Sequence, residues 1–166
     1  MTISETNQKF ANLAAEKYHQ LSSNPLGFFI SAMLAGAYVG VGIILILSVG
    51  ADVDGGWRPL VMGASFGVAL TLVVFAGSEL YTGHTMYMTQ GVMAGKVTVR
   101  QLTLSWIVVW VGNLLGCVFL ATIAIAGSID IIMAEDGLLY QIAAKKMHLT
   151  PLEMVARGIL CNCWSA

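Results

Sequence analysis

The segment from Leu26 to Gly50 contains no charged side chain and consists mostly of apolar residues and glycine. A membrane-spanning helix needs about 20 predominantly apolar residues, so this segment can cross a bilayer with some tilt. Further apolar runs follow at 60–76 and 104–127. We therefore predict an all-α membrane domain over residues 26–166. Its spans are expected at about 26–50, 60–77 and 104–127, with a fourth helix starting at residue 151.

The composition also favours a membrane protein. Hydrophobic residues make up 57% of the chain and charged residues 10%, against about 25% charged residues in soluble domains. A net charge of −1 argues against a nucleic-acid partner. The sequence contains no nucleophile–base pair, metal-ligand spacing or phosphate loop, so we expect no enzyme activity, no cofactor and no metal. The three cysteines, which lack a CxxC spacing, are expected to be small packing residues.

Residues 1–25 are polar, with apolar positions at helical spacing. The residues on one side of this helix are Phe10, Leu13, Ala14, Lys17 and Leu21. This pattern predicts an amphipathic helix at the membrane surface. The segment lacks the basic start and short apolar core of a signal peptide. The eight lysines and arginines divide equally between the two sides of the predicted spans, and the short loops favour a cytoplasmic N-terminus.

Pairs of glycines one helical turn apart recur along the chain. They are Gly36 and Gly40, Gly63 and Gly67, Gly91 and Gly95, and Gly112 and Gly116. Such pairs let helix backbones approach closely in a membrane, where packing replaces the hydrophobic effect. We therefore expect a tightly packed helical bundle.

The polar segment from Gly77 to His84 interrupts the apolar sequence that continues over 85–94. The continuation is about half as long as a span, which favours a broken or re-entrant helix over an ordinary loop. A broken helix leaves backbone N–H groups at the start of its second half, and these attract anions. We interpret Gly77, Glu79, Gly83 and His84 as structural residues of this break.

Individual polar residues near the break have two interpretations each. Glu79 is either a functional ionisable group or, preferably, a cap for the second half-helix. His84 could shuttle protons, but no partner is visible and a structural role is favoured. Asn113, inside the third span, is expected to form an interhelical hydrogen bond. Lys145, Lys146 and His148 form either a solvated loop or a funnel that concentrates anions, and the residues alone do not decide between these.

Several segments resemble the formate/nitrite transporter family, and in particular its nitrite-channel branch. The matching segments are Asn24–Phe28, Ala35–Gly40, Arg58–Ala64, Ala76–Met86, Gly112–Gly116 and Lys146–Asn162. The sequence Gly-Ser-Glu-Leu at 77–80 favours nitrite, since formate channels typically have Ala-Asp-Leu-Phe there.

The resemblance implies an aquaporin-like protomer with two inverted halves and one pore, assembled as a homopentamer in the inner membrane. By this resemblance Lys146 attracts the anion, which favours the funnel interpretation. The positions that correspond to the pore lining and its constriction are Phe66, Leu70, Leu80, Tyr81 and Thr82.

The family pattern continues beyond this sequence, with two more spans and a pore histidine. We therefore expect the chain to represent a truncated protomer of about the first half, which does not conduct by itself. After Cys161-Asn162 the family that this sequence resembles commonly continues with Trp-Leu-Val-Cys. Deleting one G from DNA that encodes those four residues yields Cys-Trp-Ser-Ala, the sequence found at 163–166. This suggests a frameshift, which sequencing across codon 162 would test.

Three alternatives to an inactive nitrite-channel fragment stay open. The chain could be a non-conducting scaffold or accessory subunit, a formate or hydrosulfide channel, or a half-protomer that assembles with an oppositely inserted copy.

Overall fold

The computed structural model describes residues 3–53, 55–127 and 137–165, and these contain helices and no strand. The helices are α1 (Ile3–Ser23), α2 (Pro25–Ala51), the 3₁₀ turn η1 (Gly55–Trp57), α3 (Arg58–Phe75), α4 (Tyr81–Met93), α5 (Val99–Ala126), α7 (Leu138–Met147) and α8 (Pro151–Ser165). Three segments, Pro25–Ala51, Gly55–Phe75 and Val99–Ala126, are long and apolar enough to cross a membrane. The prediction of an all-α fold with three membrane-competent helices is confirmed.

Some helix boundaries differ from the sequence-based expectation. α4 begins at Tyr81, so Gly83 and His84 lie inside this helix and the break itself is shorter than predicted. α5 begins at Val99 where we expected residue 104. The helix α7 lies between the third predicted span and the fourth helix, where no helix was predicted.

Local side-chain caps explain where three helices begin. The Asn24 Oδ1 accepts a hydrogen bond from the Gly27 N–H at 3.0 Å at the start of α2. Thr98 and Gln101 exchange side-chain and backbone hydrogen bonds at the start of α5, at 2.7 and 3.3 Å. Thr150 and Glu153 form the same capping box before α8. Each cap satisfies backbone N–H groups that the first turn of a helix leaves unbonded.

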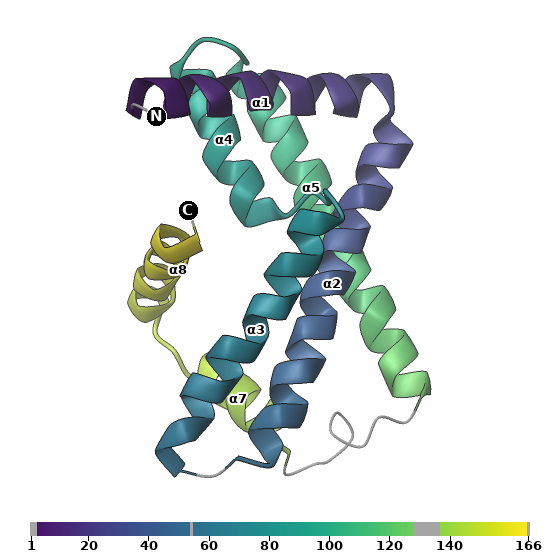
Figure 1. Cartoon of the computed structure of the whole chain (residues 1–166), viewed down its shortest axis with the longest axis vertical. Coiled ribbons are helices and arrows are strands. Elements are labelled where there is room, and N and C mark those ends of the chain that lie inside the picture. The colour runs from purple at the N-terminus through teal and green to yellow at the C-terminus, as the bar shows by residue number, and fades with distance from the viewer. Residues whose placement is uncertain (1–2, 54, 128–136, 166) are drawn as a thin grey trace. The chain divides into compact units, whose positions relative to one another are not determined.

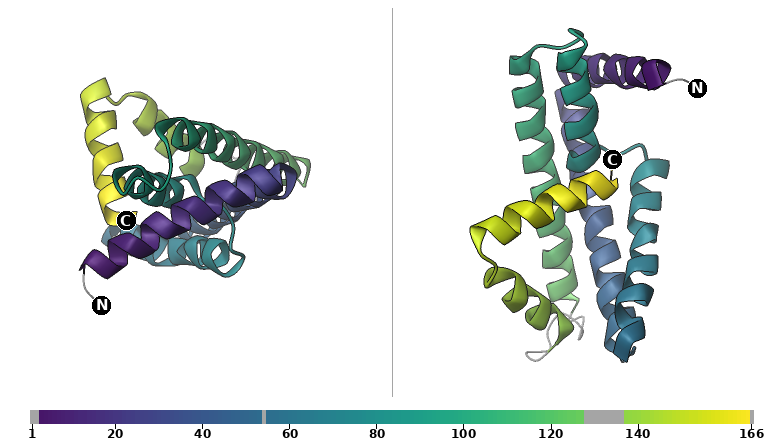
Figure 2. Two further views of the ribbon diagram at one scale, coloured as in Figure 1. Left: turned by 90° about the horizontal axis from the view of Figure 1, so that it is seen from above. Right: turned by 90° about the vertical axis from the view of Figure 1, so that its left-hand side faces the viewer.

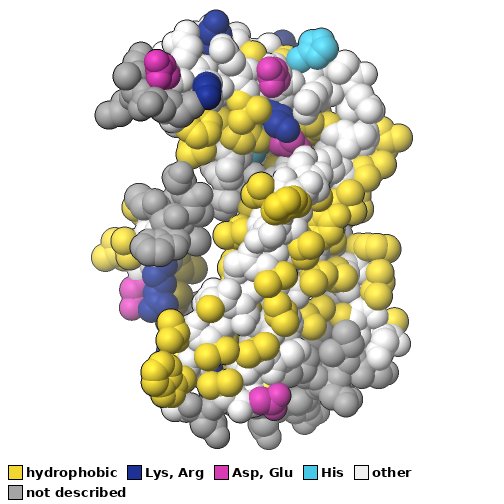
Figure 3. All heavy atoms as spheres, viewed as in Figure 1, with side chains coloured by type: hydrophobic (Ala, Val, Ile, Leu, Met, Phe, Trp, Pro, Cys, Tyr) yellow, Lys and Arg dark blue, Asp and Glu magenta, His cyan; other side chains and the backbone are white. Residues whose placement is uncertain are grey.

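The chain divides into two compact units, which are described separately. The first unit contains α1, α2 up to Gly36, α4, and α5 up to Gly116. In it α1 lies crosswise over α4 (Figures 1 and 2). Its apolar side packs against a cluster formed by Ala14, Tyr87, Met88 and Val97. The apolar side of α1, from which we predicted a membrane-surface helix, therefore also packs against protein. Charged side chains gather over α1 in Figure 3.

Within the first unit, glycines bring α2 and α5 into backbone contact. A Cβ atom added to Gly116 would lie 1.8 Å from the Met33 carbonyl oxygen, and one added to Gly36 would lie 2.0 Å from the Asn113 carbonyl oxygen. A Cβ atom added to Gly112 would lie 2.6 Å from the Ala32 Cβ. No side chain larger than hydrogen fits at these positions unless the backbones separate.

The second unit contains the remainder of α2 and α5, together with η1, α3, α7 and most of α8. In this unit Gly42 packs on Ala69 of α3, and Gly40 packs on Leu120 of α5. Gly63 and Gly67, however, have nothing within 4 Å of an added Cβ in the described structure. The close packing expected from the glycine pairs therefore does not extend to the pair on α3 among the described residues.

Large apolar side chains are exposed along the α3 helix of the second unit. They include Leu60, Val68, Leu70, Leu72, Val74 and Phe75. Figure 3 shows hydrophobic side chains spread over the visible face of this unit. Such a surface is unsuited to water and suits lipid or another apolar partner.

Candidate functional site: the helix break before Tyr81

The chain leaves the helical conformation between Phe75 and Tyr81. Gly77 has a φ of 60°, in the left-handed region that glycine adopts without steric penalty. Leu80 is extended, with φ −88° and ψ 131°, and occupies the N-cap position of α4. Gly83 lies in the first turn of α4 and has space for a larger side chain, because an added Cβ would meet only the Tyr87 ring, at 4.0 Å. Of the two glycines predicted to shape the break, only Gly77 has a positive φ.

Asn113 of α5 holds the break in place. Its Oδ1 accepts a hydrogen bond from the Tyr81 N–H at 3.0 Å. Its Nδ2 donates to the carbonyl oxygens of Ala32 at 2.8 Å and Glu79 at 2.9 Å. The Asn113 side chain thus joins α5 to α2 and to the break by hydrogen bonds, which agrees with the interhelical hydrogen bond that we expected. It also caps α4. The prediction that Glu79 caps α4 is wrong, because Asn113 does so.

Glu79 is 3% exposed, and its carboxylate belongs to a polar cluster inside the first unit. Lys17 of α1 forms an ion pair and hydrogen bond with Oε1, and the Tyr87 hydroxyl donates to Oε2 at 2.8 Å. The His84 Nδ1 lies 3.4 Å from the same Oε2. A buried carboxylate requires such compensation. Glu79 therefore ties the break to both α1 and α4.

His84 is fully buried and has partners that the sequence did not reveal. Its Nδ1 lies 2.8 Å from the Tyr87 Oη. Because the Tyr87 hydroxyl proton is directed to Glu79, the Oη accepts from His84, which places the proton of a neutral imidazole on Nδ1. The Nε2 has no hydrogen-bond partner among the described residues. The Phe28 ring meets the imidazole edge-on, with centroids 5.9 Å apart.

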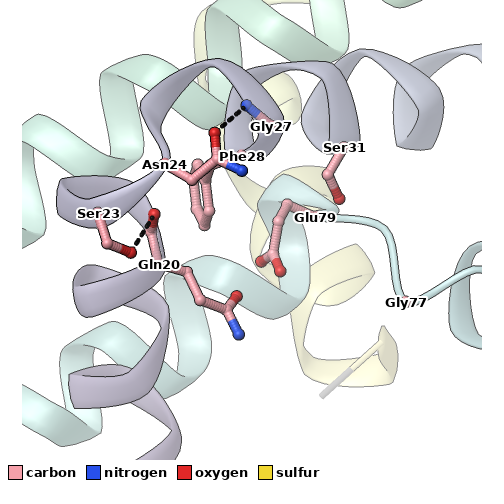
Figure 4. Close-up of a pocket in the computed structure, with 8 residues that line it drawn as sticks. All are labelled: Gln20, Ser23, Asn24, Gly27, Phe28, Ser31, Gly77 and Glu79. Carbon is pink, nitrogen blue, oxygen red and sulfur yellow. Dashed lines mark hydrogen bonds between the residues drawn. The ribbon is translucent and has the colours of Figure 1, made fainter.

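A polar pocket of about 220 Å³ opens beside Glu79. Figure 4 shows the Glu79 side chain entering from the break, facing Gln20 of α1, with Ser31 of α2 nearby. The remaining lining residues are Ser23, Asn24, Gly27, Phe28 and Gly77. The pocket is large enough for several water molecules, each of which occupies about 30 Å³ in the liquid.

The residues predicted to line a pore fall into both units. Leu80, Tyr81 and Thr82 follow one another at the start of α4 in the first unit, and all three are half-buried. Tyr81 also packs edge-on against Trp106, with ring centroids 6.4 Å apart.

In the second unit, Phe66 and Leu70 lie one turn apart on α3. The Phe66 ring lies beside α2, 3.6 Å from the position of a Cβ on Gly42. Lys146 is exposed in the last turn of α7.

Two participants of the polar cluster were not predicted from the sequence. Tyr87 was not singled out, although it lies three residues after His84 on the same helical face. Lys17 was predicted only to lie on the apolar side of the first helix, and that position was the one sign that it faces a buried partner.

Comparison with known proteins places these features in a family. The family model described as formate/nitrite transporter matches residues 4–164. The nitrite transporter NirC of Escherichia coli is 43% identical over 160 residues, which cover 96% of this chain and 60% of that protein. The formate channel FocA of Haemophilus influenzae is 31% identical over 149 residues, covering 87% of this chain and 52% of that one.

A solved structure described as an FNT family ion channel superimposes with a TM-score of 0.86 at 44% identity. The match covers 89% of this chain and 59% of that channel. The chain thus spans about 60% of the length of the nitrite transporters it matches. The chain is a multi-pass membrane protein that belongs to the formate/nitrite transporter family.

Proposed function

We propose that this chain forms part of a channel protomer that passes nitrite, or a similar small monovalent anion, across the inner membrane. The observation that carries the proposal is the start of α4, a helix that begins next to buried residues. Its first turn carries the positive end of the helix dipole. The Tyr81 N–H of this turn is bonded to the Asn113 Oδ1 at 3.0 Å.

An apolar side chain next to these N–H groups suits selection of a weakly hydrated anion. Leu80 lies two residues before Thr82, so an anion at this point would meet an apolar group, a hydroxyl and the N–H groups of the first helical turn. Apolar constrictions reject strongly hydrated ions, whereas hydrogen-bond donors stabilise an anion that has lost water. Tyr81 of the first unit, and separately Phe66 and Leu70 of the second, are further proposed pore-lining residues. Lys146 is proposed to attract anions by its charge.

The 43% sequence identity to the E. coli nitrite transporter favours nitrite over formate or hydrosulfide as the main substrate. The proposal includes a homopentamer, a cytoplasmic N-terminus and an α1 helix at the membrane surface. The polar outer side of α1 supports its placement at the interface, where charged side chains reach water.

Nitrite uptake into proteoliposomes tests the proposed function. One sample contains the 166-residue chain, and a second contains the chain fused to the remaining C-terminal part of the E. coli relative. We expect uptake with the fusion, slower uptake when the fusion carries Lys146→Gln, and none with the chain alone. A folded fusion that takes up no nitrite would refute the proposal. Competition by formate and hydrosulfide in the same assay ranks the three anions.

A further inference from the structure

The cap of α4 comes from a residue on another helix. An N-cap position normally holds Ser, Thr, Asp or Asn, whose side-chain oxygen accepts from the first turn. In α4 this position holds Leu80, which cannot accept a hydrogen bond. The Asn113 Oδ1, 32 residues further along the chain, accepts from the Tyr81 N–H in its place.

The two ends of the Asn113 carboxamide have different roles. The oxygen satisfies one N–H group of α4, and the NH₂ group satisfies two carbonyl oxygens, those of Ala32 and Glu79. Aspartate could replace only the oxygen, and leucine, of similar size, could replace neither. The side chain therefore fixes both the position of α4 and the path of the backbone on either side of Leu80.

We propose that Asn113 is the positioning residue for the constriction at Leu80 and Thr82, and thereby determines which anions pass; this rests on the proposed function. Because Asn113 supplies the cap, residue 80 is released from that task and can be apolar. Without Asn113, the first turn of α4 loses its only side-chain cap among the described residues and frays. The constriction then widens and discriminates less between small and larger anions.

The structural part of the proposal is tested by hydrogen exchange on the 166-residue chain in detergent. The Tyr81 amide has no carbonyl partner within α4, so its protection reports on Asn113. We expect exchange about tenfold faster in Asn113→Leu, in line with the usual stabilisation by a cap. Asn24→Leu, which removes a local cap from α2, is the matched control and should accelerate exchange at Gly27 but not at Tyr81.

Unchanged protection of Tyr81 in a folded Asn113→Leu protein would overturn the proposal. If Asn113→Leu does not fold, the additional change Leu80→Asn supplies a local cap. Recovery of a folded protein by that change supports the proposal, and no recovery contradicts it.

The functional part is tested in the fusion protein by the ratio of nitrite to nitrate uptake. We expect this ratio to fall severalfold in Asn113→Leu, with a change in KM as well as in maximal rate. A ratio equal to that of the unmodified fusion would overturn the assignment of selectivity. If no fusion transports nitrite while Tyr81 exchange still depends on Asn113, the proposed function and the selectivity role fail, and the remote cap remains.

Discussion

Gly116→Ala is expected to separate α2 from α5. The added Cβ would lie 1.8 Å from the Met33 carbonyl oxygen, and real Cβ atoms essentially never approach another heavy atom within 3.0 Å. Since the contact is with backbone, no rotamer change relieves it, and the helices must move apart by about 1.2 Å. The same movement would lengthen the 2.8 Å bond from Asn113 to Ala32 to about 4 Å, beyond hydrogen-bonding distance.

The expected loss in the free energy of unfolding follows from three contributions. Overpacking typically costs about 1–3 kcal/mol. Loss of one interhelical hydrogen bond in a membrane protein costs about 1 kcal/mol. Replacing glycine by alanine inside a helix returns about 1 kcal/mol. The net destabilisation is therefore about 2 kcal/mol.

Equilibrium unfolding in mixed micelles of dodecyl maltoside and SDS, followed by circular dichroism, measures this change. Gly63→Ala is the matched control, because an added Cβ there meets nothing within 4 Å and only the gain in helix propensity remains. We expect the two variants to shift the midpoint in opposite directions. If Gly116→Ala and Gly63→Ala unfold at one and the same SDS fraction, the close approach of α2 and α5 does not stabilise the first unit.

Three further substitutions probe the polar cluster and the helix caps by the same unfolding assay. Lys17→Met leaves the Glu79 carboxylate buried without its cation and should lower the free energy of unfolding by about 3 kcal/mol. Adding Glu79→Gln should recover most of that loss, and a double variant no more stable than Lys17→Met would contradict this. Tyr87→Phe removes the hydroxyl between His84 and Glu79 and should cost about 1–2 kcal/mol, so an unchanged midpoint would argue against that hydrogen bond. Thr98→Ala removes one half of the α5 capping box and should cost about 1 kcal/mol, with faster amide exchange at Gln101 as a local readout.

Features that the sequence encodes locally were predicted well. Uncharged apolar runs identified the three membrane-competent helices, because the bilayer sets both their length and their composition. Residue 151 was correctly predicted as a helix start, which agrees with the Thr150 and Glu153 capping box. The start of α5 at Val99 was missed, although the Thr98 and Gln101 pair carried the same signal.

Features that depend on distant residues could not be predicted in this way. The cap of α4 was assigned to the neighbouring Glu79, because nothing in the local sequence points to Asn113, 32 residues further on. The ion pair of Glu79 with Lys17 joins residues 62 positions apart. The spacing of two glycines also does not predict by itself whether another helix packs against them. The same spacing occurs at Gly116, which is closely packed, and at Gly63, where an added Cβ meets nothing within 4 Å.

The remote cap has a consequence for biogenesis. During synthesis α4 emerges from the ribosome before Asn113, which follows Tyr81 by 32 residues, so its first turn enters the insertion machinery with the Tyr81 amide unsatisfied by the protein. Water or the machinery itself has to solvate that amide until α5 enters the membrane. Entry of α5 thus completes the N-terminal geometry of α4, and a ribosome stalled before residue 113 would carry a nascent chain whose α4 has not yet reached that geometry.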